Sequence, residues 1–267
     1  AHSGKLNLLT TFEDEVKVEL GTSSKEAGMA SYKALERAME DYKNGLFDVL
    51  VTAPINKNNI HGDGFSFCGH TEYLEERAGE GKKSLMILLN DVMRVALVTT
   101  HLPIKDVAQA INKELIIEKA TIFNNSLKRD FRISNPRIAV LSLNPHAGDG
   151  GLLGAEEQEI IAPAIQELSS NGVYAFGPYA ADGFFARGGY DSFDGVLAMY
   201  HDQGLAPFKA LDRGDGVNFT AGLPIVRTSP DHGTAYEIAG KNVADESSFR
   251  HAVYLALDVF RNRAEYD

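Results

Sequence analysis

The stretch "GVLAMYHDQGL", residues 195–205, decides how the rest of the chain is interpreted. It begins with an apolar run, which is typical of a strand buried on both faces of a sheet. His201 and Asp202 follow this run directly, without turn-forming residues between the strand and the polar pair. Ligands of open α/β sheets bind beyond the carboxyl ends of the strands, so this imidazole is predicted to face a ligand rather than the core.

Similar apolar runs alternate with longer segments of helical period along the whole chain. This alternation predicts an α/β fold with a mostly parallel sheet and helices on both of its faces. No internal repeat or linker is visible. We predict strands at 47–53, 84–90, 93–100, 137–143, 195–200 and 223–229, and helices at 24–43, 104–128 in two pieces, 155–170 and 246–262.

Composition indicates a soluble, globular protein. A chain of 267 residues, 44% of them hydrophobic, can bury a sizeable core. The net charge of −11 argues against a nucleic-acid-binding groove, which needs clustered Lys and Arg. No run of about 18 apolar residues predicts a membrane span, and "AHSGKLNLLT" (1–10) does not resemble a signal peptide. Cys68 is the single cysteine, so an intrachain disulfide is excluded and a cytoplasmic location is expected.

Histidines recur after apolar runs or in glycine-rich turns. Three of them share the strand-end position, and three neutral imidazoles with one open position suit a catalytic Zn²⁺ or a similar divalent metal. Asp202 is a candidate acceptor that fixes the tautomer of a ligating ring. For any single histidine, a hydrogen-bonding surface role remains the alternative. The histidines in these positions are His70, His101, His146, His201 and His232, and the three at strand ends are His101, His146 and His201.

Two further segments are candidate anion sites. "NPHAGDGGLLGAEE" (144–157) is either a phosphate-binding loop before a helix or a plain tight turn, because it matches neither the dinucleotide nor the P-loop pattern. Lys209 and Arg227 flank Asn218 in a region poor in other cations. These two cations are predicted to anchor an anionic ligand, with solvated surface charges as the alternative.

Five motifs together resemble the 4-hydroxythreonine-4-phosphate dehydrogenase family of pyridoxal phosphate biosynthesis. They occur in the family's order, and the similarity runs from about residue 45 to 262. The last of them also resembles the adenine-binding loop of isocitrate and isopropylmalate dehydrogenases, which implies their two-lobed α/β fold. The motifs are "GHTEYLEERA", "VALVTTHLPIKDVAQAI", "LNPHAGDGG", "LAMYHDQGL" and "IVRTSPDHGTAYEIAGKNVAD".

This resemblance implies a role for each matching residue. It implies a divalent metal, zinc first, with cobalt, magnesium, nickel and manganese as alternatives, and NAD as the second cofactor. It also implies a homodimer whose two subunits both contribute to each active site. The implied metal ligands are His101, His146 and His201; the substrate contacts are His70, Thr71, Lys209, Asn218 and Arg227; the NAD contacts are His232, Gly233, Thr234, Ala235 and Asp245; the catalytic candidates are Lys209, Asp202 and Asp182.

The beginning of the chain departs from the family pattern. The family opens with a strand and a Gly-Asp-Pro-x-Gly-Ile-Gly-type turn, which residues 1–45 do not contain. We therefore expect residues 1–267 to form one two-lobed catalytic unit without that opening strand. The boundary between the lobes is not readable from composition.

The implied reaction is the NAD-dependent, metal-assisted oxidation and decarboxylation of 4-phosphooxy-threonine to 3-amino-2-oxopropyl phosphate. The general base remains open among Lys209, His70 and Asp202. A catabolic relative that oxidises another phosphorylated hydroxy acid, such as phosphoerythronate, is the nearest alternative. A metal-dependent phosphohydrolase and a non-catalytic anion-binding protein are more distant ones.

Overall fold

The computed structural model describes residues 2–12, 16–61 and 65–267. Within these residues a single eight-stranded sheet has the order β1-β8-β7-β2-β3-β6-β4-β5. Four of its seven pairings are parallel, and the three antiparallel ones lie in the middle, where β7 and β2 run next to each other. The predicted α/β class is therefore confirmed. The strands are β1 (Val49–Val51), β2 (Leu85–Leu89), β3 (Arg94–Leu97), β4 (Arg137–Leu141), β5 (Tyr174–Tyr179), β6 (Gly195–Ala198), β7 (Val217–Ala221) and β8 (Val226–Pro230).

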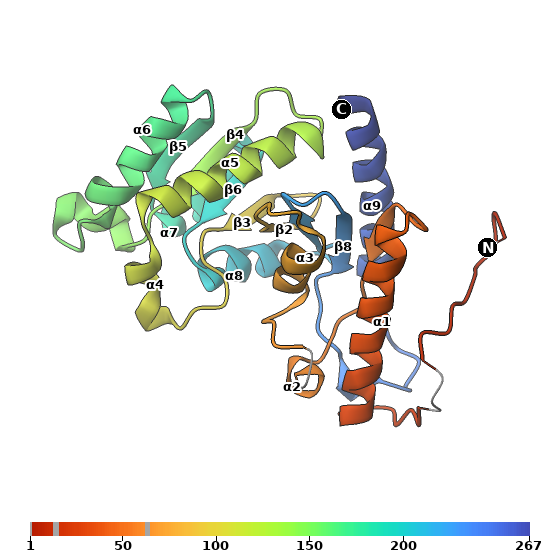
Figure 1. Ribbon diagram of the computed structural model, residues 1–267. Coiled ribbons are helices and arrows are strands. Elements are labelled where there is room, and N and C mark those ends of the chain that lie inside the picture. The colour runs from red at the N-terminus through yellow and green to blue at the C-terminus, as the bar shows by residue number, and fades with distance from the viewer. Residues whose placement is uncertain (1, 13–15, 62–64) are drawn as a thin grey trace.

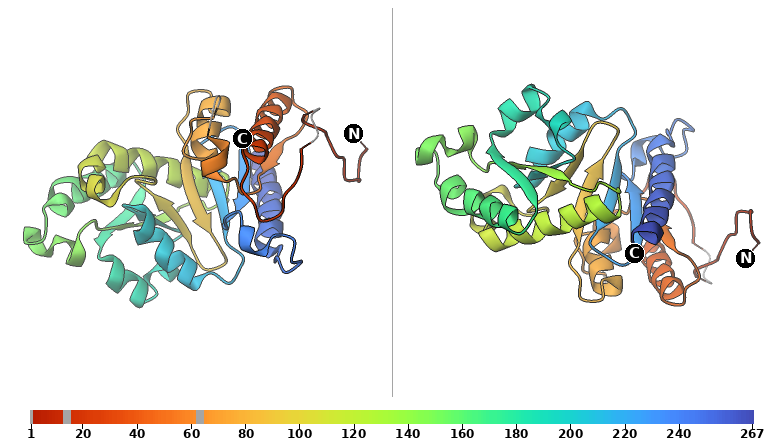
Figure 2. Two further views of the ribbon diagram at one scale, coloured as in Figure 1. Left: turned by 90° about the horizontal axis from the view of Figure 1, so that it is seen from below. Right: turned by 90° about the horizontal axis from the view of Figure 1, so that it is seen from above.

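Helices cover both faces of this sheet, and Figure 2 shows the strands running between α5 on one side and α8 on the other. Their order along the chain can be followed in Figure 1. The helices are α1 (Lys25–Lys43), α2 (Lys57–Ile60), α3 (His70–Ala78), α4 (Ile104–Ala110), α5 (Lys113–Arg129), α6 (Ala162–Ser170), α7 (Ala181–Ala186), α8 (His201–Leu211) and α9 (Ser247–Tyr266), with the short turns η1 (Pro145–Gly151), η2 (Glu157–Ile161), η3 (Gly189–Ser192) and η4 (Tyr236–Ile238).

The alternation of side chains along the strands produces two differently packed faces. Ile87 and Ala96 lie in the core that α5, α6 and α9 complete. Leu88 and Val95, one residue along, lie in a separate core with α7 and α8. A third core on the α1 and α3 side contains Tyr73. Because two separate cores share the second face, the polar residues between them can line a cavity.

All six predicted strands and the predicted helices are present, with shorter strand limits. Two strands, β5 and β7, and the helices α2, α3, α7 and α8 escaped the prediction. β7 alternates polar Asn218 and Thr220 with apolar residues, so it lacks the continuous apolar pattern of its neighbours. β5 contains Pro178, which normally argues against a strand and is tolerated here at the edge of the sheet.

Helix α8 was missed because it contains two residues that usually break helices, Gly204 and Pro207. A Cβ at position 204 would lie 2.7 Å from Cγ1 of Val95. Glycine therefore allows α8 to approach the sheet closely. Among the described residues, no helix is both long enough and apolar enough to cross a membrane.

Candidate active site

A cavity of about 330 Å³ lies between the two cores on the second face of the sheet. Its walls come from the β1 side and the middle of the sheet: the segments after β1, β3 and β8, and the helices α3 and α8. Nine residues that the sequence singled out line it, namely His70, Thr71, His101, His201, Lys209, Asn218, Arg227, His232 and Gly233.

The rings of His101 and His201 are brought together by the neighbouring parallel strands β3 and β6. The pairing of these strands continues beyond their ends, where Thr99 donates its backbone N–H to Met199 O at 3.1 Å. Gln203 fixes the turn into α8, because its side chain accepts from Met199 N at 2.7 Å and donates to Ser142 O at 2.6 Å. The two imidazole centroids are 6.2 Å apart.

Each of these two rings has a carboxylate beside its Nδ1 atom. Glu72 Oε1 lies 3.5 Å from His101 Nδ1, and Asp202 Oδ1 lies 2.7 Å from His201 Nδ1. Asp202 is thus located where the predicted tautomer-fixing acceptor should be. The hydrogen bond with His101 is the main effect that lowers the pKa of Glu72, against its burial. With a carboxylate at Nδ1, each ring would bind a metal through Nε2, as in carboxylate–histidine–metal groups.

The third predicted ligand, His146, is not part of this cluster. It is exposed in η1, and it does not line the cavity. Glu157 stabilises the start of this loop by accepting the N–H groups of Leu143 at 2.8 Å and Asn144 at 2.7 Å. Asp182 on α7 is also exposed and outside the cavity. Within residues 2–12, 16–61 and 65–267, no three His, Cys, Asp or Glu residues are arranged to hold a metal ion.

Arg227 is a buried cation, with 3% of its surface exposed. It donates to Thr52 Oγ1 from Nη2 at 2.7 Å and to Thr220 Oγ1 from Nη1 at 3.2 Å. No described carboxylate lies within ion-pair distance of it. Burial lowers the pKa of Arg227 to about 9, so it remains protonated at neutral pH. An unpaired buried charge is costly, and an anionic ligand would offset that cost.

Three cavity-lining residues each have a buried polar atom without a hydrogen-bond partner: Nε2 of His70, Oε2 of Glu72 and Oδ1 of Asn218. Burial, with smaller effects from Arg227 and Lys57, lowers the pKa of His70 to about 3. His70 is therefore a neutral imidazole near pH 7. Buried polar atoms without partners are rare in native structures, which indicates a polar ligand at this position.

Lys209 lies on α8, opposite Asp231. Its Nζ donates to Asp231 Oδ2 and to the Asp231 backbone oxygen, both at 3.1 Å. Burial raises the pKa of Asp231, although Lys209 acts in the opposite direction. Nζ of Lys209 is thus already engaged as a hydrogen-bond donor at the cavity wall, which suits the binding of an anion there.

Sequence reasoning missed three charged residues that line the cavity: Lys57, Glu72 and Asp231. Lys57 Nζ lies 3.4 Å from His101 Nε2. Lys57 and Asp231 follow strand ends, in "TAPINK" after β1 and in "SPDHG" at the end of β8. Glu72 is in "GHTE" at the start of α3, where the sequence singled out its neighbours His70 and Thr71.

A second cavity of about 750 Å³ adjoins the first and shares Ala53, Pro54, His232 and Gly233 with it. Thr234 and Ala235 also line it. Asp245 does not line it but follows Ala244, which does, and accepts the N–H of Ser247 at 2.7 Å. The predicted cofactor loop thus borders a space large enough for a second ligand.

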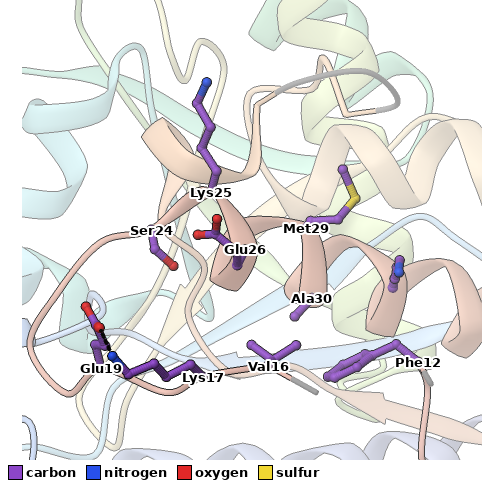
Figure 3. Close-up of a pocket in the computed structure, with 10 residues that line it drawn as sticks. Phe12, Val16, Lys17, Glu19, Ser24, Lys25, Glu26, Met29 and Ala30 are labelled. Carbon is purple, nitrogen blue, oxygen red and sulfur yellow. Dashed lines mark ion pairs between the residues drawn. The ribbon is translucent and has the colours of Figure 1, made fainter. Parts of the chain in front are cut away.

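A third cavity, of about 700 Å³, lies between the N-terminal segment and α1 (Figure 3). Phe12 and Val16 lie beside Met29 and Ala30 of α1 there. Figure 3 marks one ion pair at this cavity, between the exposed side chains of Lys17 and Glu19. Since it contains none of the strand-end residues, it is not part of the candidate site.

Comparisons with known proteins agree with this picture. Residues 1–256 match the family model described as "Pyridoxal phosphate biosynthetic protein PdxA". A 4-hydroxythreonine-4-phosphate dehydrogenase of Bacteroides thetaiotaomicron is 64% identical over 97% of this chain and 71% of its own length. The enzyme of the same name from a Sulfurihydrogenibium species is 49% identical over 93% of this chain and 76% of its own.

Solved structures show the same relationship. The crystal structure of a 4-hydroxythreonine-4-phosphate dehydrogenase from Klebsiella pneumoniae has a TM-score of 0.77 and 36% identity, over 90% of this chain and 73% of that one. A structure from Burkholderia phymatum bearing the same enzyme name has a TM-score of 0.72 and 40% identity, over 93% of this chain and 74% of that one.

Proposed function

This chain belongs to the PdxA family of pyridoxal phosphate biosynthetic proteins, and from that premise we propose that it is a 4-hydroxythreonine-4-phosphate dehydrogenase that uses NAD. It would oxidise the secondary hydroxyl of 4-phosphooxy-threonine and release CO₂ to give 3-amino-2-oxopropyl phosphate. One observation carries this proposal. An unpaired buried cation and two oriented imidazoles line one cavity, and a second cavity adjoins it.

The phosphate group would bind at Arg227, with Lys209 as a second cation at the cavity wall. The fork of guanidinium N–H donors suits phosphate oxygens, and Arg227 uses only some of its donors on Thr52 and Thr220. Binding energy from this remote group can hold the reacting carbon in place. Asn218 and neutral His70 would then bind polar groups of the substrate, with His70 Nε2 accepting a hydrogen bond.

A divalent metal would be held by His101 and His201, whose Nδ1 atoms are already engaged by carboxylates. When bound, such a cation lowers the pKa of a coordinated hydroxyl and stabilises developing negative charge. His146 is the predicted third ligand, and it lies outside the cavity of its own chain. We therefore propose a homodimer, in which His146 of a second copy completes the site and Asp182 acts at the same interface.

The nicotinamide ring would enter from the adjoining cavity, with the loop from His232 to Ala235 near the adenosine and Asp245 at the edge. The oxidation transfers a hydride from the substrate carbon to NAD⁺ and a proton from the hydroxyl to a base. The resulting β-keto acid loses CO₂ and takes up one proton at carbon. Of the candidate bases, His70 is weakened by its low pKa, and Nζ of Lys209 already donates to Asp231, which leaves Asp202 as the remaining candidate.

We further propose that the two ends of the sheet act as the two lobes of one catalytic unit over residues 1–267. The position of the first cavity supports this, because β1 and β8 contribute one wall and β3 and β6 the other. Substrate and cofactor would then bind between the lobes.

Appearance of NADH from 4-phosphooxy-threonine, measured with metal and with a chelator, tests this function. We expect NADH formation that stops on chelation and returns when metal is added. The same assay with phosphoerythronate separates the catabolic alternative. Release of inorganic phosphate without NAD would instead support a hydrolase, and phosphate binding without turnover would support a binding protein.

A further inference from the structure

His101 is held between two opposite charges that come from other parts of the chain. Glu72 Oε1, on α3, is 3.5 Å from Nδ1 of the ring, and Lys57 Nζ, on α2, is 3.4 Å from Nε2. Both charged groups precede β2, whereas His101 follows β3. The ring therefore depends on contacts made across the cavity.

These two contacts select one tautomer. A carboxylate only accepts hydrogen bonds and an ammonium only donates them. Glu72 therefore favours a proton on Nδ1, and Lys57 favours a lone pair on Nε2. This is the state in which a histidine binds a metal through Nε2, and the Lys57 ammonium stands where that cation would be.

His201 lacks this dependence on distant segments. Its Nδ1 partner, Asp202, is the next residue in the chain and is carried by the same helix. Glu72, by contrast, follows directly after His70 and Thr71, and its Oε2 atom is buried without a partner. The first turn of α3 thus carries two of the proposed substrate contacts, His70 and Thr71, together with Glu72, which orients His101.

We propose that Glu72 and Lys57 are positioning residues that act on His101 with opposite effects on metal affinity. Glu72 orients the ring for coordination, and Lys57 occupies Nε2 until a metal displaces it. Substrate bound to the first turn of α3 fixes Glu72 and so strengthens the metal site. The inference rests on the proposed function, because that function assigns the metal to His101.

Calorimetric titration of the protein with Zn²⁺ or Co²⁺ alone tests the two effects. Glu72→Gln should weaken metal binding about 10- to 100-fold, the usual effect of losing such an outer partner. Lys57→Gln should tighten it about two- to fivefold, as expected for losing one exposed polar contact. Glu76→Gln, on the exposed side of the same helix, and Lys43→Gln, at the exposed end of α1, make the same charge changes away from the cavity. These two controls should retain the wild-type affinity.

The tautomer of His101 in the metal-free protein gives a second readout, measured by long-range ¹H–¹⁵N correlation. We expect the Nδ1–H form in the wild type and a mixture of forms in Glu72→Gln. If the wild type shows this tautomer but binds no metal, the proposed metal site fails and the role of Glu72 stands. If Glu72→Gln binds metal like Glu76→Gln, if Lys57→Gln weakens binding, or if the wild-type ring carries its proton on Nε2, the inference is overturned.

Discussion

The guanidinium of Arg227 donates two hydrogen bonds to the hydroxyl of Thr52, at 2.7 and 3.1 Å, in the interior of the sheet. Thr52 follows β1, the parallel neighbour of the strand that carries Arg227. A neutral partner orients this cation but leaves its charge uncompensated. In the function proposed above, the relationship between these two residues prepares an anion site before any ligand arrives.

Replacing Arg227 with Met should weaken substrate binding without lowering the stability of the ligand-free protein. We expect KM for the phosphorylated substrate to rise about 10- to 100-fold, the effect of losing hydrogen bonds to a charged group. The ligand-free protein should unfold at the same or a higher temperature, because an unpaired buried charge is removed. Steady-state kinetics and thermal unfolding measure the two effects. A lower unfolding temperature with unchanged KM would assign Arg227 a purely structural role.

The low pKa of His70 should make the free energy of unfolding depend on pH. Its pKa falls from 6.5 to about 3 on folding, so the unfolded chain binds more protons between these values. The stability that His70 contributes is complete above about pH 6.5 and is lost as the pH falls towards 3. Urea unfolding at several pH values measures this effect. As the pH falls, the free energy of unfolding should decrease less steeply in His70→Gln than in the wild type.

His61→Gln is the matched control for that series, because His61 is exposed and lies outside the cavity. Its pH dependence should follow that of the wild type. Equal slopes for the wild type and His70→Gln would mean that His70 titrates in the folded protein as it does in the unfolded chain.

Gly204→Ala should displace α8 from the sheet. The new methyl group would lie 2.7 Å from Val95 and 2.9 Å from Leu97, and overpacking of this kind costs about 1–3 kcal/mol. Since α8 carries His201 and Lys209, turnover should fall as well. Gly183→Ala on α7 has open space around its Cβ and should leave both properties nearly unchanged. Chemical denaturation and the NADH assay compare the two variants.

Sequence reasoning was most successful where one strand determines a residue's position. His101 and His201 follow apolar runs that become β3 and β6, and the pairing of these neighbours brings the rings together. Lys57 and Glu72 could not be paired with His101 in this way, because their contacts with the ring join segments far apart in the chain. No local pattern encodes such a contact.

Two of the elements that escaped prediction, β7 and α8, are shaped by the site. β7 lacks a continuous apolar run in part because Asn218 faces the cavity instead of a core. α8 contains Gly204 because the helix must lie close to β3. His146 presents a different problem. Its loop has six consecutive residues with positive φ, from His146 to Gly151, with values between 42° and 99°, and its predicted partners belong to a second copy of the chain.

Anomalous diffraction from crystals grown with Zn²⁺ or Co²⁺ tests the central claim most directly, namely that His101 and His201 hold the metal at which the substrate is oxidised. We predict one strong peak about 2.0–2.1 Å from Nε2 of both rings, with an imidazole of a neighbouring copy as the third ligand. A peak bound by other residues, or none at these rings in protein that still oxidises the substrate, would contradict the account.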